Sequence, residues 1–175
     1  MHLLLALISI IAVWYRGDYR NWGKYYSTMQ FIAIGNLTYN FLCAAHWLWR
    51  LSPDAIKWFN HTLLEMSYTF ITFPATALMF LSRYPEGQGK WRIFRHYAFW
   101  VGLYVVAEII LLVKGSILYK YGWSLLWSAA FDCIMFPFLR LHDKKPLITI
   151  LISVPFTIYL LWLFEIPVHI PIENR

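Results

Sequence analysis

Long apolar runs separated by short polar segments dominate the pattern along the chain. Six runs stand out, at about residues 2–15, 25–49, 62–82, 94–113, 121–141 and 146–164. A helix needs about 20 mostly apolar residues to cross a bilayer, and it satisfies its own backbone hydrogen bonds there. The pattern therefore predicts an all-α, polytopic membrane helix bundle of six transmembrane helices, forming a single domain over residues 1–175.

The first run is the shortest of the six. A secretory signal peptide begins with positive charge and ends at a cleavage site of small residues. Here only His2 stands at the start, and Trp14, Tyr15 and Arg16 follow the run. We therefore expect a retained helix. A segment lying flat at the membrane surface is the alternative, and it leaves five spans.

Composition and charge agree with a membrane protein. The chain is 60% hydrophobic and 14% charged, whereas a soluble domain has roughly 45–50% apolar and about 25% charged residues. The net charge is +6, but the basic residues form short clusters between the runs instead of one basic face. Such clusters are typical of topology signals and do not predict nucleic-acid binding. The expected partner is the lipid bilayer.

The distribution of Lys and Arg predicts an orientation. The segments after the first, third and fifth runs carry ten of them: Arg16, Arg20, Lys24, Arg83, Lys90, Arg92, Arg95, Arg140, Lys144 and Lys145. The other side carries five: Arg50, Lys57, Lys114, Lys120 and Arg175. The richer side faces the cytoplasm. Both termini are therefore expected outside the plasma membrane.

Polar residues recur at helical spacing within the runs, where they mark one face of each helix. The stripes are Asn36 and Asn40; Glu65, Thr69, Thr72 and Thr76; Trp100, Tyr104 and Glu108; and Ser124, Ser128 and Asp132. We expect these faces to point into the bundle. We expect most of the Ser and Thr side chains to form hydrogen bonds between helices. Each such bond stabilises the bundle by about 0.6 kcal/mol.

The carboxyl groups in the runs are the strongest functional signal. A charged group at the centre of a membrane helix costs about 2.5–3.5 kcal/mol, and no Lys or Arg lies in the interior of a run. Each carboxyl is therefore either neutral or holds a proton in transit, a cation or a cationic substrate. We predict an outward-opening polar cavity lined by Asn40, Glu65, Glu108 and Asp132. Purely structural hydrogen bonding between helices is the open alternative.

Three further residues belong to the predicted ligand- or proton-binding site. Asn36 and Tyr104 can hydrogen-bond either form of a carboxyl group. His61 lies four residues before Glu65 on the same predicted helix and can share a proton with it. The cysteines, Cys43 and Cys133, stand in apolar runs without a C-x-x-C or Cys/His cluster, so we expect neither a metal nor a cofactor.

Two long strings carry a family resemblance. HTLLEMSYTFITFPATALMFLSRYP and YGWSLLWSAAFDCIMFPFLRLHDKKPL, together with GNLTYNF and Glu108, resemble a family of small multi-pass membrane proteins from endospore-forming, Bacillus-type bacteria. The resemblance extends from about Tyr25 to the last run. It implies a multi-pass helical fold in a bacterial plasma membrane. The family carries no assigned reaction, substrate or catalytic residue, so no function follows from it.

Three functions are compatible with these residues. The first is binding or passage of a small ligand, proton or cation at the carboxyl groups. The second is a structural or accessory subunit that docks a membrane-protein partner. The third is an intramembrane acid–base enzyme acting on a lipid or isoprenoid. The third is disfavoured because the chain has no H-E-x-x-H, no G-x-S-x-G and no phosphate-binding loop.

Overall fold

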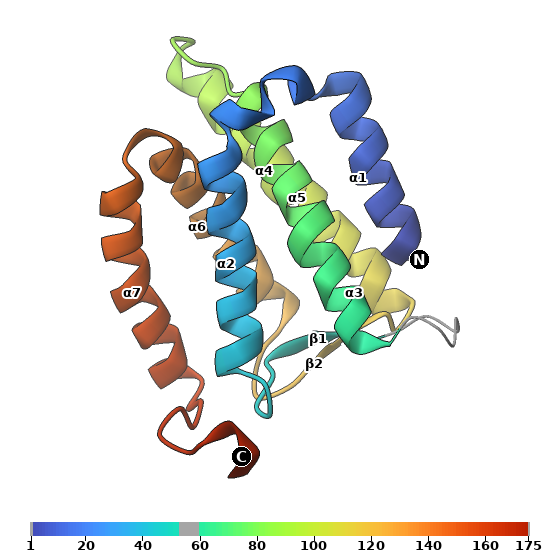
Figure 1. Ribbon diagram of the computed structural model, residues 1–175, viewed down its shortest axis with the longest axis vertical. Helices are drawn as coiled ribbons and strands as arrows, with labels where there is room; N and C mark the ends of the chain where they lie inside the picture. Colours follow the sequence, from blue (N-terminus) through green and yellow to red (C-terminus); the bar gives the residue numbers. More distant parts are fainter. Residues whose placement is uncertain (1, 53–59, 175) are drawn as a thin grey trace.

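The structure is a computed structural model that describes residues 2–52 and 60–174. Within these residues it contains helices and one small sheet (Figure 1). The helices are α1 (His2–Arg16), α2 (Tyr26–Leu42), α3 (His61–Ser67), α4 (Phe73–Ser82), α5 (Lys90–Val113), α6 (Leu125–Lys144) and α7 (Pro146–Leu163). Short 3₁₀ segments at Tyr19–Lys24 and Ile172–Asn174, a π turn at Tyr68–Thr72, and strands β1 (Trp49–Leu51) and β2 (Ile117–Tyr119) complete the chain.

Four helical segments are long and apolar enough to cross a membrane. They are His61–Ser82, Lys90–Val113, Leu125–Lys144 and Pro146–Leu163. Their length and composition match those of membrane spans, so the prediction of an apolar helical bundle is confirmed to that extent. The helices α1 and α2, of 15 and 17 residues, are shorter.

The helices run alternately up and down the bundle (Figure 1). The sheet and the chain ends lie at one end of the bundle, which we call the sheet end, and the α4–α5 and α6–α7 connections lie at the opposite, loop end. Helix α4 packs against α1 and α2, and α6 packs against α2, α4, α5 and α7. The two central helices are therefore α4 and α6.

The second predicted span, residues 25–49, is only partly helical. Helix α2 ends at Leu42, and the chain then turns into β1, where Trp49 pairs with Tyr119 of β2. The Tyr39 hydroxyl fastens this strand to α2, because it donates to the Trp49 carbonyl at 2.6 Å and accepts from the N–H groups of Leu48 and Trp49. The sheet is the one β element in the described residues, and the run of apolar residues gave no sign of it.

Helix α6 begins later than the predicted run at residue 121. Tyr121 and Gly122 both have positive φ, 52° and 79°, and form a turn. Ser124 then caps the helix, as its hydroxyl oxygen accepts from the N–H of Trp127. Asp132 therefore lies about 10 Å into α6 at a rise of 1.5 Å per residue, nearer the sheet end than a helix that begins at residue 121 would place it.

The third span contains a π turn immediately before Pro74. The N–H of Phe73 bonds to the carbonyl of Tyr68, five residues earlier. Proline has no N–H to donate, and π turns inside helices adjust such interruptions. The wider turn rotates the residues before it relative to those after it. The predicted stripe from Glu65 to Thr76 is therefore split between two neighbours, α2 on one side and α5 on the other.

Candidate functional site

Three neighbouring helices each carry one polar and one aromatic side chain, spaced by one helical turn, in the same order along the bundle. On each of α4, α5 and α6, a polar side chain is followed one turn nearer the loop end by an aromatic one. The pairs are Thr76 and Phe80, Tyr104 and Trp100, and Asp132 and Phe136. A polar layer therefore lies directly above an aromatic layer where these helices meet.

The aromatic layer is tightly packed. Phe80 and Phe136 are each 0% exposed, and their ring centroids are 5.1 Å apart. The Trp100 ring lies 5.9 Å from that of Phe136, and the Tyr104 ring meets Phe136 edge-on at 5.3 Å. Such contacts hold membrane helices together because lipid offers no hydrophobic driving force between them. The layer gives the polar groups above it a rigid base.

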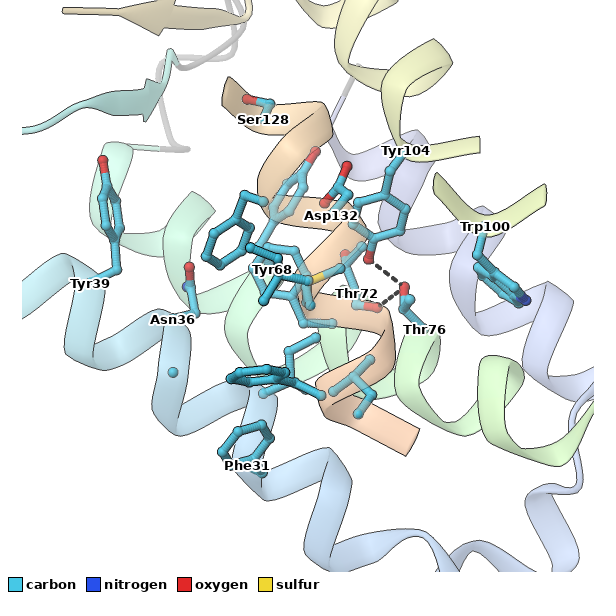
Figure 2. A pocket seen from close by; sticks show the side chains of 18 of the residues that line it. Phe31, Asn36, Tyr39, Tyr68, Thr72, Thr76, Trp100, Tyr104, Ser128 and Asp132 are labelled. Carbon is cyan, nitrogen blue, oxygen red and sulfur yellow. Dashed lines mark hydrogen bonds between the residues drawn. The ribbon is translucent and has the colours of Figure 1, made fainter. Parts of the chain in front are cut away.

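The hydroxyl donors of the polar layer are already used (Figure 2). The Tyr104 hydroxyl donates to Thr76 Oγ1 at 2.8 Å, and Thr76 Oγ1 in turn donates to the Thr72 carbonyl at 2.9 Å. The Thr72 hydroxyl is buried and has no hydrogen-bond partner among the described residues. The unpaired Thr72 hydroxyl therefore lies near the Tyr104–Thr76 hydrogen bond.

Asp132 has no hydrogen-bond partner in the described part of the chain. Its side chain lies beside Tyr104 (Figure 2), yet the residue is only 6% exposed. Buried polar groups are nearly always paired, and desolvating one without a partner costs free energy. The Asp132 side chain instead borders a cavity between the helices.

Glu108, one turn from Tyr104, is in contrast well satisfied. Its Oε1 accepts from the Tyr119 hydroxyl at 2.5 Å and from the Ser128 hydroxyl at 2.7 Å. The indole N–H of Trp123 donates to Ser128 Oγ at 2.9 Å. Burial, followed by the bond to Glu108, raises the pKa of the Tyr119 hydroxyl above its usual range. Glu108 is therefore anchored to the sheet end of the bundle.

A large cavity runs between the helices beside this layer. Its volume is about 1780 Å³, above the roughly 300–1,000 Å³ typical of small-molecule pockets. Aliphatic and aromatic side chains make up most of its lining, and Asn36, Glu108 and Asp132 are among the polar residues between them. The sequence predicted a polar cavity, whereas the cavity surface is mainly apolar and its polar groups are separated from one another.

The cavity reaches the side of the bundle. Its lining includes Ile8 on α1, Ile34 on α2 and Ile158 on α7, which are 50%, 58% and 61% exposed. Side chains on this surface face acyl chains when the bundle stands in a bilayer. The cavity therefore opens on the apolar side of the bundle.

The other predicted site residues form a second group, between α2 and α3. Asn36 donates to Thr69 Oγ1 at 2.7 Å, and Asn40 donates to Glu65 Oε2 at 3.3 Å. His61 Nδ1 lies 3.1 Å from the Leu51 carbonyl oxygen and 3.9 Å from Glu65 Oε1. Of this group only Asn36 is among the described residues that line the cavity. The seven predicted residues therefore form two groups, one around Asp132 and Glu108 and one around Glu65. Asn36 belongs to the second group and also lines the cavity.

Some residues of the site were not predicted. Thr72, Thr76 and Ser128 were recognised on polar stripes but interpreted as helix–helix contacts. Tyr119 and Trp123 lie in β2 and in the turn before α6, outside any helical periodicity. Their spacing in the sequence carries no signal of the contacts with Glu108 and Ser128, because those contacts depend on how the chain folds back.

Comparisons with protein-family models, curated proteins and solved structures find no match for this chain. The resemblance to a family of Bacillus-type membrane proteins therefore stays a prediction. Function is inferred from the geometry of the site.

Proposed function

We propose that this chain is an integral membrane protein that binds a small, mainly apolar molecule within the bilayer, in the cavity around Asp132. The observation that carries the proposal is a buried carboxyl group without a partner, bordering a large and otherwise apolar space. Ionisable groups inside a membrane are expensive and usually functional. An apolar pocket with a few polar groups that fix orientation is the usual form of a ligand site.

The ligand enters from the lipid. The cavity lining includes exposed side chains on α2 and α7, such as Ile34 and Ile158, and both surfaces are apolar. A molecule dissolved among acyl chains reaches the cavity there without crossing a polar surface. This favours an apolar ligand over a hydrated ion.

The proposal includes a topology of six spans in a bacterial plasma membrane: α1, α2, α3 to α4, α5, α6 and α7. The ten Lys and Arg residues counted on the richer side all lie at or near the loop end, while Arg50, Lys114 and Lys120 lie at the sheet end. Lys57 and Arg175 lie outside the described residues. The loop end then faces the cytoplasm, and both termini lie outside.

Filling the cavity should weaken binding. Gly35 lines the cavity, and a side chain added there has open space to enter. We expect Gly35→Trp to weaken the binding of 1-adamantanol, a compact apolar probe, at least fivefold by isothermal titration calorimetry in phosphatidylcholine nanodiscs.

The matched control is Gly102→Trp. Gly102 is also a helix glycine with open space around it, but it is not among the residues that line the cavity. Its variant should bind the probe as the unmodified protein does. Equal affinity of both variants, or no measurable binding of either 1-adamantanol or 1-adamantylamine by the unmodified protein, would contradict the proposed function.

A further inference from the structure

We infer that the ligand carries a positively charged amino group that binds Asp132, so the protein takes lipophilic amines. This inference rests on the proposed function, because it names the ligand class for the same cavity. Three observations carry it: the hydrogen-bonding inventory around Asp132, the placement of basic groups, and the apolar lining.

Hydrogen-bond acceptors exceed donors around Asp132. Tyr104 donates to Thr76, and Thr76 donates to the Thr72 carbonyl, so neither proton is free for the carboxyl. The hydroxyls of Tyr119 and Ser128 both donate to Glu108. Both carboxylate oxygens of Asp132 remain open, and the Thr72 hydroxyl oxygen can also accept. Tyr68 also lines the cavity, and its hydroxyl lies 2.9 Å from His2 Nδ1. The unpaired Thr72 hydroxyl supplies only one donor, whereas an ammonium group supplies three.

Basic side chains of the described residues that line the cavity stay away from Asp132. Arg16 and Arg83 lie at the loop end, where Arg83 Nε donates to the Arg16 carbonyl at 2.8 Å. The aromatic layer of Phe80, Phe136 and Trp100 lies between Asp132 and that end. No arginine in the lining therefore neutralises Asp132.

The two histidines that line the cavity are also engaged elsewhere. His142 Nδ1 pairs with Thr28 Oγ1 at 3.0 Å, and its ring stacks on Phe31 at 4.3 Å. His96 Nε2 lies 3.0 Å from the Phe80 carbonyl oxygen. One titratable side chain that interacts electrostatically with Asp132 is another acid, Glu108. A bound cation would favour the ionised form of Asp132, because an opposite charge nearby stabilises a carboxylate.

The remainder of the cavity selects for an apolar body. Its lining is mostly aliphatic and aromatic, so a hydrated metal ion would lose its water without enough oxygen ligands to replace it. An aminophospholipid headgroup also carries an ammonium, but its phosphate would have no arginine of the lining beside Asp132 to pair with. A molecule with one ammonium group on a hydrocarbon body fits both the Asp132 carboxyl and the apolar lining.

Three probes of equal shape test the inference. They are 1-adamantylamine, which is a cation at neutral pH, neutral 1-adamantanol and anionic 1-adamantanecarboxylate, titrated into the full-length protein in phosphatidylcholine nanodiscs. We expect the amine to bind at least tenfold more tightly than the alcohol, and the carboxylate to bind most weakly. In Asp132→Asn the amine should lose its advantage over the alcohol.

Variants and lipid composition complete the test. Thr72→Val removes the unpaired hydroxyl while keeping the side-chain shape, and we expect it to reduce the preference for the amine by twofold or more. If Asp132→Asn does not fold, the ranking of the three probes by the unmodified protein and the Thr72→Val variant decide the question. Discs that contain phosphatidylethanolamine should bind the amine as well as discs without it.

The results that overturn the inference differ from those that overturn the proposed function. If the alcohol binds as well as the amine and Gly35→Trp weakens both, the cavity binds apolar molecules but the ligand is not an amine. If phosphatidylethanolamine displaces the amine, the site takes a headgroup and the inference fails. If none of the probes binds, both the inference and the proposed function fail.

Discussion

Asp132 and Glu108 show how two acids on facing helices acquire different roles. Glu108 accepts two hydrogen bonds, from Tyr119 and Ser128, whereas Asp132 has no partner among the described residues. A buried polar group left unpaired costs about 1–3 kcal/mol. Asp132 therefore lowers the stability of the empty protein, while Glu108 contributes to it. Retaining such a cost is typical of binding sites.

This difference predicts opposite effects on stability. Asp132→Leu should raise the melting temperature of the ligand-free protein, in line with about 1–3 kcal/mol recovered from an unpaired group. Glu108→Leu should lower it, because the Tyr119 and Ser128 hydroxyls lose their acceptor. Thermal unfolding of both variants in the same detergent measures the two shifts. A lower melting temperature for Asp132→Leu would favour the alternative in which this carboxyl locks the helices together.

At the scale of elements, the packing of α1 depends on a close approach at its end. A Cβ atom at Gly17 would lie 2.7 Å from the Val13 carbonyl oxygen and 2.9 Å from Leu78 Cδ2 on α4. Both distances are below ordinary contact, and one of the atoms belongs to the backbone. The absence of a side chain at Gly17 therefore lets the chain leave α1 while packed against α4.

Gly17→Ala should loosen this contact. Overpacking of this kind costs roughly 1–3 kcal/mol, so the melting temperature should fall by several degrees. Gly23→Ala is the control, because a Cβ atom there meets nothing within 4 Å. Circular dichroism during heating compares the two variants. Similar melting temperatures would mean that α1 is not held by this approach.

For the molecule as a whole, the unequal charge of the two ends of the bundle predicts its orientation in the membrane. Basic residues collect at the loop end, and the sheet end carries fewer of them. We use a chain in which Cys43 and Cys133 are replaced by alanine. A cysteine in place of Lys114, at the sheet end, should react with a membrane-impermeant maleimide on intact cells. A cysteine in place of Gln88, at the loop end, should react only after the cells are opened. The reverse result would invert the proposed topology.

Hydrophobic periodicity was enough to predict the helices, their apolar character and the polar faces on which Tyr104, Glu108, Ser128 and Asp132 lie. These properties are local, because the position of a side chain around a helix depends only on its spacing from neighbours a turn away. Helix ends were less predictable. The end of α2 and the start of α6 depend on a strand and on the cap at Ser124, and an apolar run marks neither.

Which faces meet was decided only by the tertiary structure. The π turn before Pro74 separates Glu65 and Thr69 from Thr76, so residues expected on one stripe serve two neighbours. Tyr119 reaches Glu108 from a strand whose pairing is not encoded in any local pattern. The sequence could show that Asp132 is a buried acid without a nearby base. It could not show that Glu108 is paired and Asp132 is not, because hydrogen bonds between helices depend on their packing, and spacing along the chain does not determine that packing.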